Sequence, residues 1–206
     1  MLTESATRQR HQTLTESGTH QSLVTFIKTI EMELTEAVTM LANDRFNSLQ
    51  KEKWADLGCG NGTFTRALAH LLQPQSIIYA VDTNKPALDQ IPAAYNSVLI
   101  ETIQGNFEAH DLPFKDLDGI LMANSLHYIK DKNSFIQRAV GYLKEGGCFF
   151  LIEYDTDKAN QWVPYPLSYS SLTGVFNQAG FHSIRKLQER ASVFGHSTLY
   201  STLIQR

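Results

Sequence analysis

The sequence predicts an α/β fold with one doubly wound sheet of seven strands, mostly parallel, with an antiparallel strand at the carboxyl end. Two patterns support this fold class. From residue 53 onward, apolar strand-like segments alternate with segments of helical periodicity, which is typical of parallel strands joined by crossover helices. The last two strand-like segments, by contrast, are separated only by a short loop, so we expect them to pair antiparallel.

Each predicted element depends on its own pattern. Short apolar runs predict strands, and apolar residues at a period of about 3.6 residues predict helices. We expect strands at 53–57, 76–81, 98–104, 117–123, 148–154, 181–190 and 198–204, and helices at 63–72, 86–91, 132–143 and 170–179. Gly146 and Gly147 are expected to end the third helix, because glycine is common just past a helix terminus.

The amino-terminal region differs from the rest in composition. Residues 1–20 are rich in Thr, Ser, Gln and Glu, which predicts a flexible arm. Residues 22–43 place apolar side chains on one helical face, so this helix is expected to pack on the domain and to cover the ligands. We therefore expect an arm (1–20) and a single domain (21–206) that begins with a lid helix (22–43).

Composition and charge exclude several classes of partner. The chain has 206 residues, 42% of them hydrophobic, which is enough for one sizeable core. Its net charge is −3 and its basic residues are scattered, so nucleic acid is not an expected partner. Two cysteines and no long apolar span predict a cytoplasmic protein without a membrane segment. No metal-ligand spacing stands out, and no metal is expected.

The stretch WADLGCGNGTF, residues 54–64, places three glycines between a predicted strand and a predicted helix. Gly58, Gly60 and Gly62 allow the backbone to take positive φ or to approach a ligand closely. A strand, a glycine loop and a helix N-terminus together offer free backbone N–H groups. We therefore expect a ligand to lie against this loop.

Polar and aromatic residues follow the next predicted strands. Ligands of open parallel sheets bind at the carboxyl ends of the strands, so these positions are candidates for the site. Asp82, followed by Thr83, ends the second strand, and a carboxylate there suits the two hydroxyls of a ribose. Asn106 and Phe107 follow the third strand and offer an amide and a ring to a purine. The stretch 124–128 follows the fourth strand.

Taken in order, these motifs resemble the class I S-adenosylmethionine-dependent methyltransferases, especially their small-molecule branch. The motifs are DLGCGNG, AVD, GNF, ANSLHYI, LKEGG and SLTGVFNQAGF, and they span roughly residues 50–206. The resemblance implies a Rossmann-like fold and S-adenosyl-L-methionine as the cofactor. It also implies in-line transfer of a methyl group to a small organic acceptor.

The resemblance further implies which residues bind the cofactor. In that family the glycine loop lies against the methionine part, the acidic residue that ends the second strand binds the ribose, and the pair after the third strand frames the adenine. The residues at these positions, with the one near the methyl group last, are Asp56, Gly58, Gly60, Asp82, Thr83, Asn106, Phe107 and Asn124. Asn106 departs from the commoner Asp, so a contact to the adenine amino group would be uncharged.

Two other functions remain open from the residues. A nucleotide-cofactor-dependent oxidoreductase also uses a glycine loop, but its usual spacing is G-x-G-x-x-G, whereas this chain has G-x-G-x-G. A non-catalytic protein that binds S-adenosylmethionine fits as well, because these motifs report binding and not turnover.

Aromatic residues near the carboxyl ends of the fourth and fifth strands predict the acceptor site. The stretch WVPYPLSY, residues 162–169, carries two prolines that stiffen an extended run whose rings can form the wall of an apolar cleft. The residues expected to contact the acceptor are Tyr128, Tyr154, Trp162 and Tyr165. The chain lacks the Asn/Asp-Pro-Pro-aromatic motif that grips planar nitrogens, so we expect a small, largely uncharged organic acceptor.

A dedicated general base is optional for methyl transfer. His127, a few residues past the fourth strand, is the candidate catalytic residue. Asp155 with Tyr154, after the fifth strand, is the alternative, and a histidine at position 127 can equally cap a turn or orient a loop.

Overall fold

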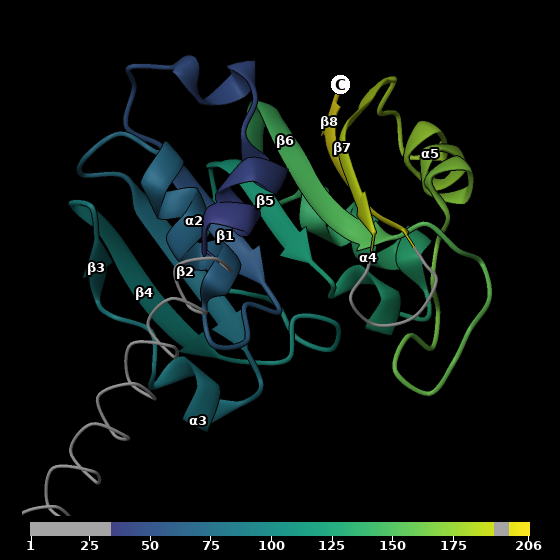
Figure 1. The fold of residues 1–206 in the computed structure, drawn as a ribbon, viewed down its shortest axis with the longest axis horizontal. Helices are drawn as coiled ribbons and strands as arrows, with labels where there is room; N and C mark the ends of the chain where they lie inside the picture. Colours follow the sequence, from purple (N-terminus) through teal and green to yellow (C-terminus); the bar gives the residue numbers. More distant parts are fainter. Residues whose placement is uncertain (1–33, 192–197) are drawn as a thin grey trace, which may run out of the picture.

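Eight strands form one sheet in the order β3-β4-β2-β1-β5-β6-β8-β7, and two of them, β3 and β8, run against the others (Figure 1). The computed structural model describes residues 34–191 and 198–206. Its strands are β1 (Lys53–Leu57), β2 (Ile77–Asp82), β3 (Ala94–Tyr95), β4 (Val98–Gln104), β5 (Leu117–Ala123), β6 (Leu143–Tyr154), β7 (Ser183–Ala191) and β8 (Thr198–Gln205). The expected Rossmann-like, mostly parallel fold is therefore confirmed.

Helices cover both faces of the sheet (Figure 1). They are α2 (Thr63–Leu71), α3 (Lys85–Leu88), α4 (Lys132–Val140) and α5 (Tyr169–Gln178), with short 3-10 helices η1 (Asp44–Asn47) and η2 (Leu126–Tyr128). Residues 34–41 are also helical. Successive strand side chains point to opposite faces. Trp54 of β1 accordingly lies in the core with α2 and residues 34–41, whereas its neighbour Ala55 lies in the core with α4 and α5.

The sheet has one strand more than predicted. Ala94 and Tyr95 of β3 pair antiparallel with Leu99 and Val98 of β4. The two residues between them, at positions 96 and 97, both have positive φ. A hairpin turn of this kind is usually marked by Asn-Gly or Asp-Gly, but here it is Asn-Ser. The strand is also too short for an alternating pattern, so the sequence carries no clear signal for it.

The boundary between α4 and β6 differs from the prediction. The helix ends at Val140, and β6 begins at Leu143, so Gly146 and Gly147 lie inside a strand and do not end a helix. The pairing of β6 with β5 shifts register at this point. A Cβ on Gly147 would lie 2.9 Å from the Leu117 carbonyl oxygen. The two glycines therefore allow the strand to bulge past β5.

The amino-terminal arm (1–20) and residues 22–33 of the predicted lid helix lie outside the described residues. Residues 34–41 are helical, and Ala37, Met40 and Leu41 are buried against the sheet. The role of the arm and the helix in covering the ligands stays a prediction.

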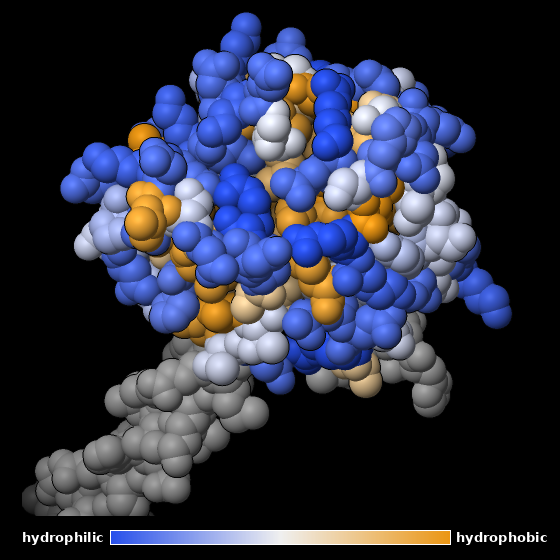
Figure 2. Space-filling view, turned by 90° about the horizontal axis from the view of Figure 1, so that it is seen from above, coloured by the Kyte–Doolittle hydropathy of each residue, from blue (hydrophilic) through white to orange (hydrophobic). Residues whose placement is uncertain are grey.

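The surface of the described residues is mixed in character. On the face seen in Figure 2, hydrophobic residues lie in small groups between hydrophilic ones. Among the described residues, no helix is both long and apolar enough to cross a membrane. The parallel strands β1, β2, β4, β5 and β6 all end at one edge of the sheet, and the loops at this edge carry the predicted site residues.

Candidate functional site

The glycine loop after β1 folds back onto the end of β2. The N–H groups of Gly58 and Cys59 donate to the Val81 carbonyl at 2.8 and 3.1 Å. The Gly60 N–H donates to Oδ2 of Asp82 at 2.9 Å. The Gly62 N–H donates to the Cys59 carbonyl at 2.9 Å. The expectation of free N–H groups is therefore wrong for these four residues, whose donors already hold the loop in place.

Gly58 is required by close packing. Its φ is +81°, and a Cβ added there would lie 2.5 Å from Cβ of Ser125 and 3.5 Å from the Phe107 ring. Ser125 is itself fixed, because its hydroxyl donates to the Leu57 carbonyl at 2.6 Å. Gly58 thus lets the loops after β1, β4 and β5 meet at one point.

Asp56 is a fully buried carboxylate beneath this loop. Its Oδ2 accepts a hydrogen bond from the Thr65 hydroxyl at 2.6 Å, whereas its buried Oδ1 has no partner among residues 34–191 and 198–206. Burial raises the pKa of Asp56 to about 7; the Thr65 hydrogen bond opposes the rise, and the charge of Asp82 adds to it. An unpaired buried oxygen indicates a place for a ligand donor.

Asp82 lies at the end of β2 with both oxygens oriented by the backbone. Oδ2 accepts from Gly60, and Oδ1 accepts from the Asn84 N–H at 2.8 Å. Each carboxylate oxygen can accept a further hydrogen bond, so the group stays able to bind hydroxyls. The adjacent Thr83 is exposed, and its carbonyl accepts from the Gln104 side chain at 3.3 Å.

Asn106 and Phe107 follow β4, as predicted. Oδ1 of Asn106 accepts from the N–H groups of Glu108 and Ala109 at 2.9 and 3.2 Å, so it caps the following turn. The half-buried Phe107 ring packs edge-on against Phe135, with centroids 5.9 Å apart. The ring thus has a fixed position beside Gly58, whereas the Asn106 oxygen is already used locally.

Asn124 occupies the end of β5 in a left-handed backbone conformation, with φ of +54°. Asn tolerates this conformation better than most side chains. Its N–H donates to the Ile152 carbonyl of β6 at 2.8 Å, and its buried Oδ1 has no partner in the part of the chain that the structure describes. Asn124 therefore presents a free acceptor next to Ser125, which contacts the glycine loop.

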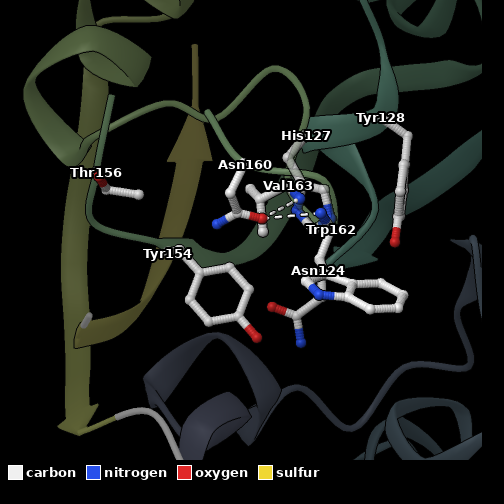
Figure 3. A pocket seen from close by; sticks show the side chains of 8 residues that line it. All are labelled: Asn124, His127, Tyr128, Tyr154, Thr156, Asn160, Trp162 and Val163. Carbon is white, nitrogen blue, oxygen red and sulfur yellow. Dashed lines mark hydrogen bonds between the residues drawn. The ribbon is translucent and has the colours of Figure 1, made fainter. Parts of the chain in front are cut away.

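A cavity of about 610 Å³ opens beside Asn124 (Figure 3). Three of its lining residues are aromatic side chains that the sequence predicted as acceptor contacts. The lining is Asn124, His127, Tyr128, Tyr154, Thr156, Asn160, Trp162 and Val163. The structure therefore brings the ends of β5 and β6 together with the segment that precedes α5. The sequence offered no signal for Thr156 or Asn160, which are ordinary loop residues, whereas Val163 lies within the predicted stretch 162–169.

Tyr165, also predicted as an acceptor contact, does not line this cavity. Its N–H donates to the His127 carbonyl at 2.9 Å. Nζ of Lys132 donates to the Ile129 carbonyl at 2.7 Å and to the Tyr165 carbonyl at 2.6 Å. Burial lowers the pKa of Lys132, although the charges of Glu153 and Glu108 oppose this. Tyr165 thus anchors the segment to the turn that carries His127.

His127 is buried and paired with Glu153, a residue that the sequence analysis missed. Oε2 of Glu153 lies 2.7 Å from Nδ1 of His127, and Oε1 accepts from the His127 N–H at 3.2 Å. Glu153 interrupts the apolar run Cys148–Ile152 one residue before β6 ends. A lone charge in a buried strand is the signal that could have identified it.

A second cavity, of about 430 Å³, adjoins the first and shares Asn124 and Tyr154 with it. It lies beneath residues 34–41 and next to α2. Its other lining residues are Glu36, Ala37, Met40, Thr63, Phe64, Ile152, Arg190 and Leu199. Arg190 of β7 forms an ion pair with Glu36, which joins helix 34–41 to the far end of the sheet. Within residues 34–191 and 198–206, no group of three or more metal-ligating side chains occurs.

Comparison with known proteins adds to this geometry. Residues 55–151 match the family model of a methyltransferase domain. A search of curated proteins finds no match.

Solved structures similar to this chain include an S-adenosylmethionine-dependent methyltransferase from Methanosarcina mazei (15% identity, 80% of this chain and 98% of that one, TM-score 0.60). An arsenic (III) S-adenosylmethionine methyltransferase from Chlamydomonas reinhardtii is similar over 84% of this chain and 72% of its own, at 16% identity and a TM-score of 0.62. Magnesium protoporphyrin IX methyltransferase from Synechocystis PCC 6803, with bound S-adenosylmethionine, is similar over 85% of this chain and 78% of its own. The identity is 15% and the TM-score is 0.57. At these low sequence identities, the structural similarity shows only the fold. The match to the family model indicates the type of domain. Residues 55–151 therefore match a methyltransferase domain, and the chain has the fold of solved S-adenosylmethionine-dependent methyltransferases.

Proposed function

We propose that this protein is an enzyme that transfers the methyl group of S-adenosylmethionine to a small organic acceptor. One observation carries the proposal: an aromatic cavity opens at Asn124, directly beside the loops that the methyltransferase motifs occupy. The cofactor would lie along the loops after β1, β2 and β4, and the acceptor would lie in the cavity. Asn124 would stand between the two ligands.

The residues around the glycine loop fit the cofactor. Asp82 would accept hydrogen bonds from the ribose hydroxyls, and the unpaired Oδ1 of Asp56 would face the ammonium group of the methionine part. Phe107 would form one wall of the adenine site. Asn106 would reach the ring through Nδ2, because its Oδ1 already accepts two backbone donors. Thr83 would lie at the exposed rim of the ribose site.

The same loop suits a dinucleotide poorly. A pyrophosphate needs free N–H donors and a positive potential at the helix N-terminus. Here four loop N–H groups are paired, and the carboxylates of Asp56 and Asp82 lie at the loop. A sulfonium cofactor carries positive charge and is favoured by these carboxylates. We therefore rank the oxidoreductase alternative below methyl transfer.

The chemistry asked of the protein is modest. S-adenosylmethionine supplies a methyl group that is already electrophilic, because it is bound to a positively charged sulfur. The chain holds the acceptor in line with that group and keeps water away from it. Orientation of this kind can contribute roughly 7 to 11 kcal/mol in well-aligned systems. The aromatic walls of the cavity supply this positioning.

The test is calorimetry with S-adenosylmethionine and its demethylated product. Asp82→Ala is expected to weaken cofactor binding by on the order of 3 kcal/mol, because two charge-assisted hydrogen bonds are lost. Asp82→Asn is expected to lie between this variant and the parent, since the amide keeps one acceptor oxygen.

The control is Asp89→Asn. Asp89 is the C-cap residue of α3, and its exposed carboxylate forms an ion pair with Lys85 of the same helix. Affinity in this variant is expected to equal that of the parent. Unchanged affinity in Asp82→Ala would show that the ribose assignment is wrong. Binding of NADH without binding of either methyl-cofactor form would favour the oxidoreductase.

A further inference from the structure

The wall of the acceptor cavity contains a buried imidazole, and a buried acid pairs with it from outside the lining. His127 is 3% exposed and Glu153 is 2% exposed. Burial of two ionisable groups costs free energy unless they pair, and both oxygens of Glu153 are used by His127 alone. A carboxylate accepts hydrogen bonds and does not donate them, so in the neutral imidazole the proton lies on Nδ1. Nε2 then carries a lone pair.

That lone pair has no partner within the described residues. Nε2 of His127 is buried and makes no hydrogen bond. His127 lines the cavity together with Asn124, the residue nearest the proposed methyl position (Figure 3). Buried polar atoms in native proteins are usually paired, and a catalytic role is one of the reasons for an exception.

We propose that His127, oriented by Glu153, is the general base for methylation of a hydroxyl, and that the acceptor is a neutral, planar molecule with a phenol-type or enol-type O–H. The inference depends on the proposed function, because it names the acceptor of that same site. His127 is then the catalytic residue and Glu153 a positioning residue.

The charges of the cavity favour a neutral acceptor. No Lys or Arg is among its lining residues in the described part of the chain. A carboxylate or phosphate acceptor would therefore find no cationic side chain among these lining residues. The rings of Tyr128, Tyr154 and Trp162 offer faces and edges to a flat molecule (Figure 3).

The buried pair favours a hydroxyl over other nucleophiles. A neutral amine already has a lone pair available, and a thiol ionises at a pKa of about 8.5. A phenol, with a pKa of about 10, remains protonated near neutral pH and is a weak nucleophile in that form. Of these three nucleophiles, the hydroxyl gains most from a base within hydrogen-bond reach.

Methylation of the hydroxyl forms one bond, breaks one bond and moves one proton. The acceptor oxygen forms the bond to the methyl carbon, the carbon–sulfur bond breaks, and its electron pair remains on sulfur. The hydroxyl proton moves to Nε2 of His127. The resulting imidazolium forms an ion pair with Glu153 and then releases the proton to solvent. No oxidant or reductant is required.

The main test is methyl transfer by the full chain to four small acceptors: catechol, 4-nitrophenol, benzylamine and thiophenol. The variant Glu153→Gln keeps an oxygen for the His127 N–H but places an amide donor opposite Nδ1, which moves the ring proton to Nε2. Transfer to catechol is expected to fall on the order of 10²- to 10⁴-fold. Transfer to 4-nitrophenol, which is ionised at mildly alkaline pH, is expected to fall far less.

Two controls separate the base from the fold. Glu101→Gln changes an exposed carboxylate on β4 that does not line the cavity, and it is expected to behave like the parent. Cofactor affinity and the unfolding midpoint of Glu153→Gln are measured beside activity. Nitrogen-15 NMR of the parent protein tests the pair without any variant, and His127 is expected to carry its proton on Nδ1.

The outcomes distinguish the inference from the proposed function. A protein that binds no S-adenosylmethionine defeats the proposed function. A protein that binds it but methylates neither hydroxyl compound, or only the amine or thiol, defeats the inference alone. Equal losses with catechol and 4-nitrophenol, or a proton on Nε2 in the parent, also overturn the role of His127.

Discussion

The two halves of the site differ in how they are built. On the cofactor side, backbone hydrogen bonds fix the glycine loop, and the carboxylate of Asp56 is fully buried. On the acceptor side, two of the aromatic side chains that line the cavity are largely open to solvent: Trp162 is 71% exposed and Tyr128 is 56% exposed. One half holds its shape through main-chain contacts, whereas the other presents surfaces that a ligand would cover.

This difference predicts which substitutions alter stability and which alter only acceptor binding. A substitution on the cofactor side disturbs burial and backbone conformation, so it should alter stability and binding together. A substitution among the exposed aromatic residues leaves the fold intact, so it should alter only acceptor binding. Three predictions test this contrast, from the largest expected effect to the smallest.

The largest effect is expected for Asp56→Asn, measured as the free energy of unfolding across pH. Burial raises the pKa of Asp56 from its ordinary 3.8 to about 7. Between these values the folded state binds a proton that the unfolded state lacks, so the parent loses stability as pH rises through this window. The loss is on the order of 4 kcal/mol, from about 1.36 kcal/mol per pKa unit.

Asn at position 56 carries no charge at any pH, so the variant is expected to lack this part of the pH dependence. Above about pH 7 the variant should be the more stable protein, yet it should bind the cofactor less tightly, because the partner for the ammonium group is neutral. If the stability of the variant depends on pH as that of the parent does, Asp56 is not the buried carboxyl group that causes this dependence.

The second effect compares Gly58→Ala with Gly60→Ala by urea unfolding. Both glycines have positive φ, which costs an alanine roughly 1 to 2 kcal/mol. Only Gly58 also lacks space, because its Cβ would lie 2.5 Å from Cβ of Ser125, whereas nothing lies within 4 Å at Gly60. Overpacking adds about 1 to 3 kcal/mol. Gly58→Ala should therefore be the less stable variant by that amount; equal losses would argue against the contact.

The smallest effect is expected for Trp162→Ala. The indole lines the cavity but is mostly exposed, so stability should change by less than about 0.5 kcal/mol. The KM for the acceptor should rise by roughly tenfold, since about 1.4 kcal/mol of contact is lost, while cofactor affinity stays unchanged.

Tyr165→Ala is the matched control, because Tyr165 is another exposed aromatic residue of the same segment that does not line the cavity. Its KM should equal that of the parent. A larger rise in KM for Tyr165→Ala than for Trp162→Ala would show that Tyr165, and not Trp162, contacts the acceptor.

The sequence predicts the strands and loops of the proposed cofactor half far better than the lining of the proposed acceptor half. The bounds of β1, β4 and β5 agree with the expected 53–57, 98–104 and 117–123, because each is an apolar run with clear ends. The rule that parallel strands end at one edge then places Asp82 against Gly60, and Phe107 near Gly58. Short motifs and a known topology are enough for this half.

The rest depends on contacts that no local pattern encodes. Gly146 and Gly147 fit both a helix end and a strand bulge, and only the pairing of β6 with β5 decides between them. The pairing of His127 with Glu153 joins positions 26 residues apart through that same sheet register. Tyr165 is an aromatic residue of the kind that lines cavities. Its backbone N–H, however, donates to the His127 carbonyl, so the residue fixes the segment to that turn.

The antiparallel direction of β8 has a consequence for how this site can diversify. Because β8 runs against β6, its first residues return to the carboxyl edge: Leu199 pairs with Tyr154, and Ala191 at the end of β7 pairs with Thr198. The end of β7 and the start of β8 therefore lie beside the second cavity, whose lining includes Arg190 and Leu199. Substitutions at these two positions change one wall of that cavity and leave the glycine loop after β1 unchanged. Evolution or an engineer can thus vary this wall while the order of the strands and the loops after β1, β2 and β4 stay the same.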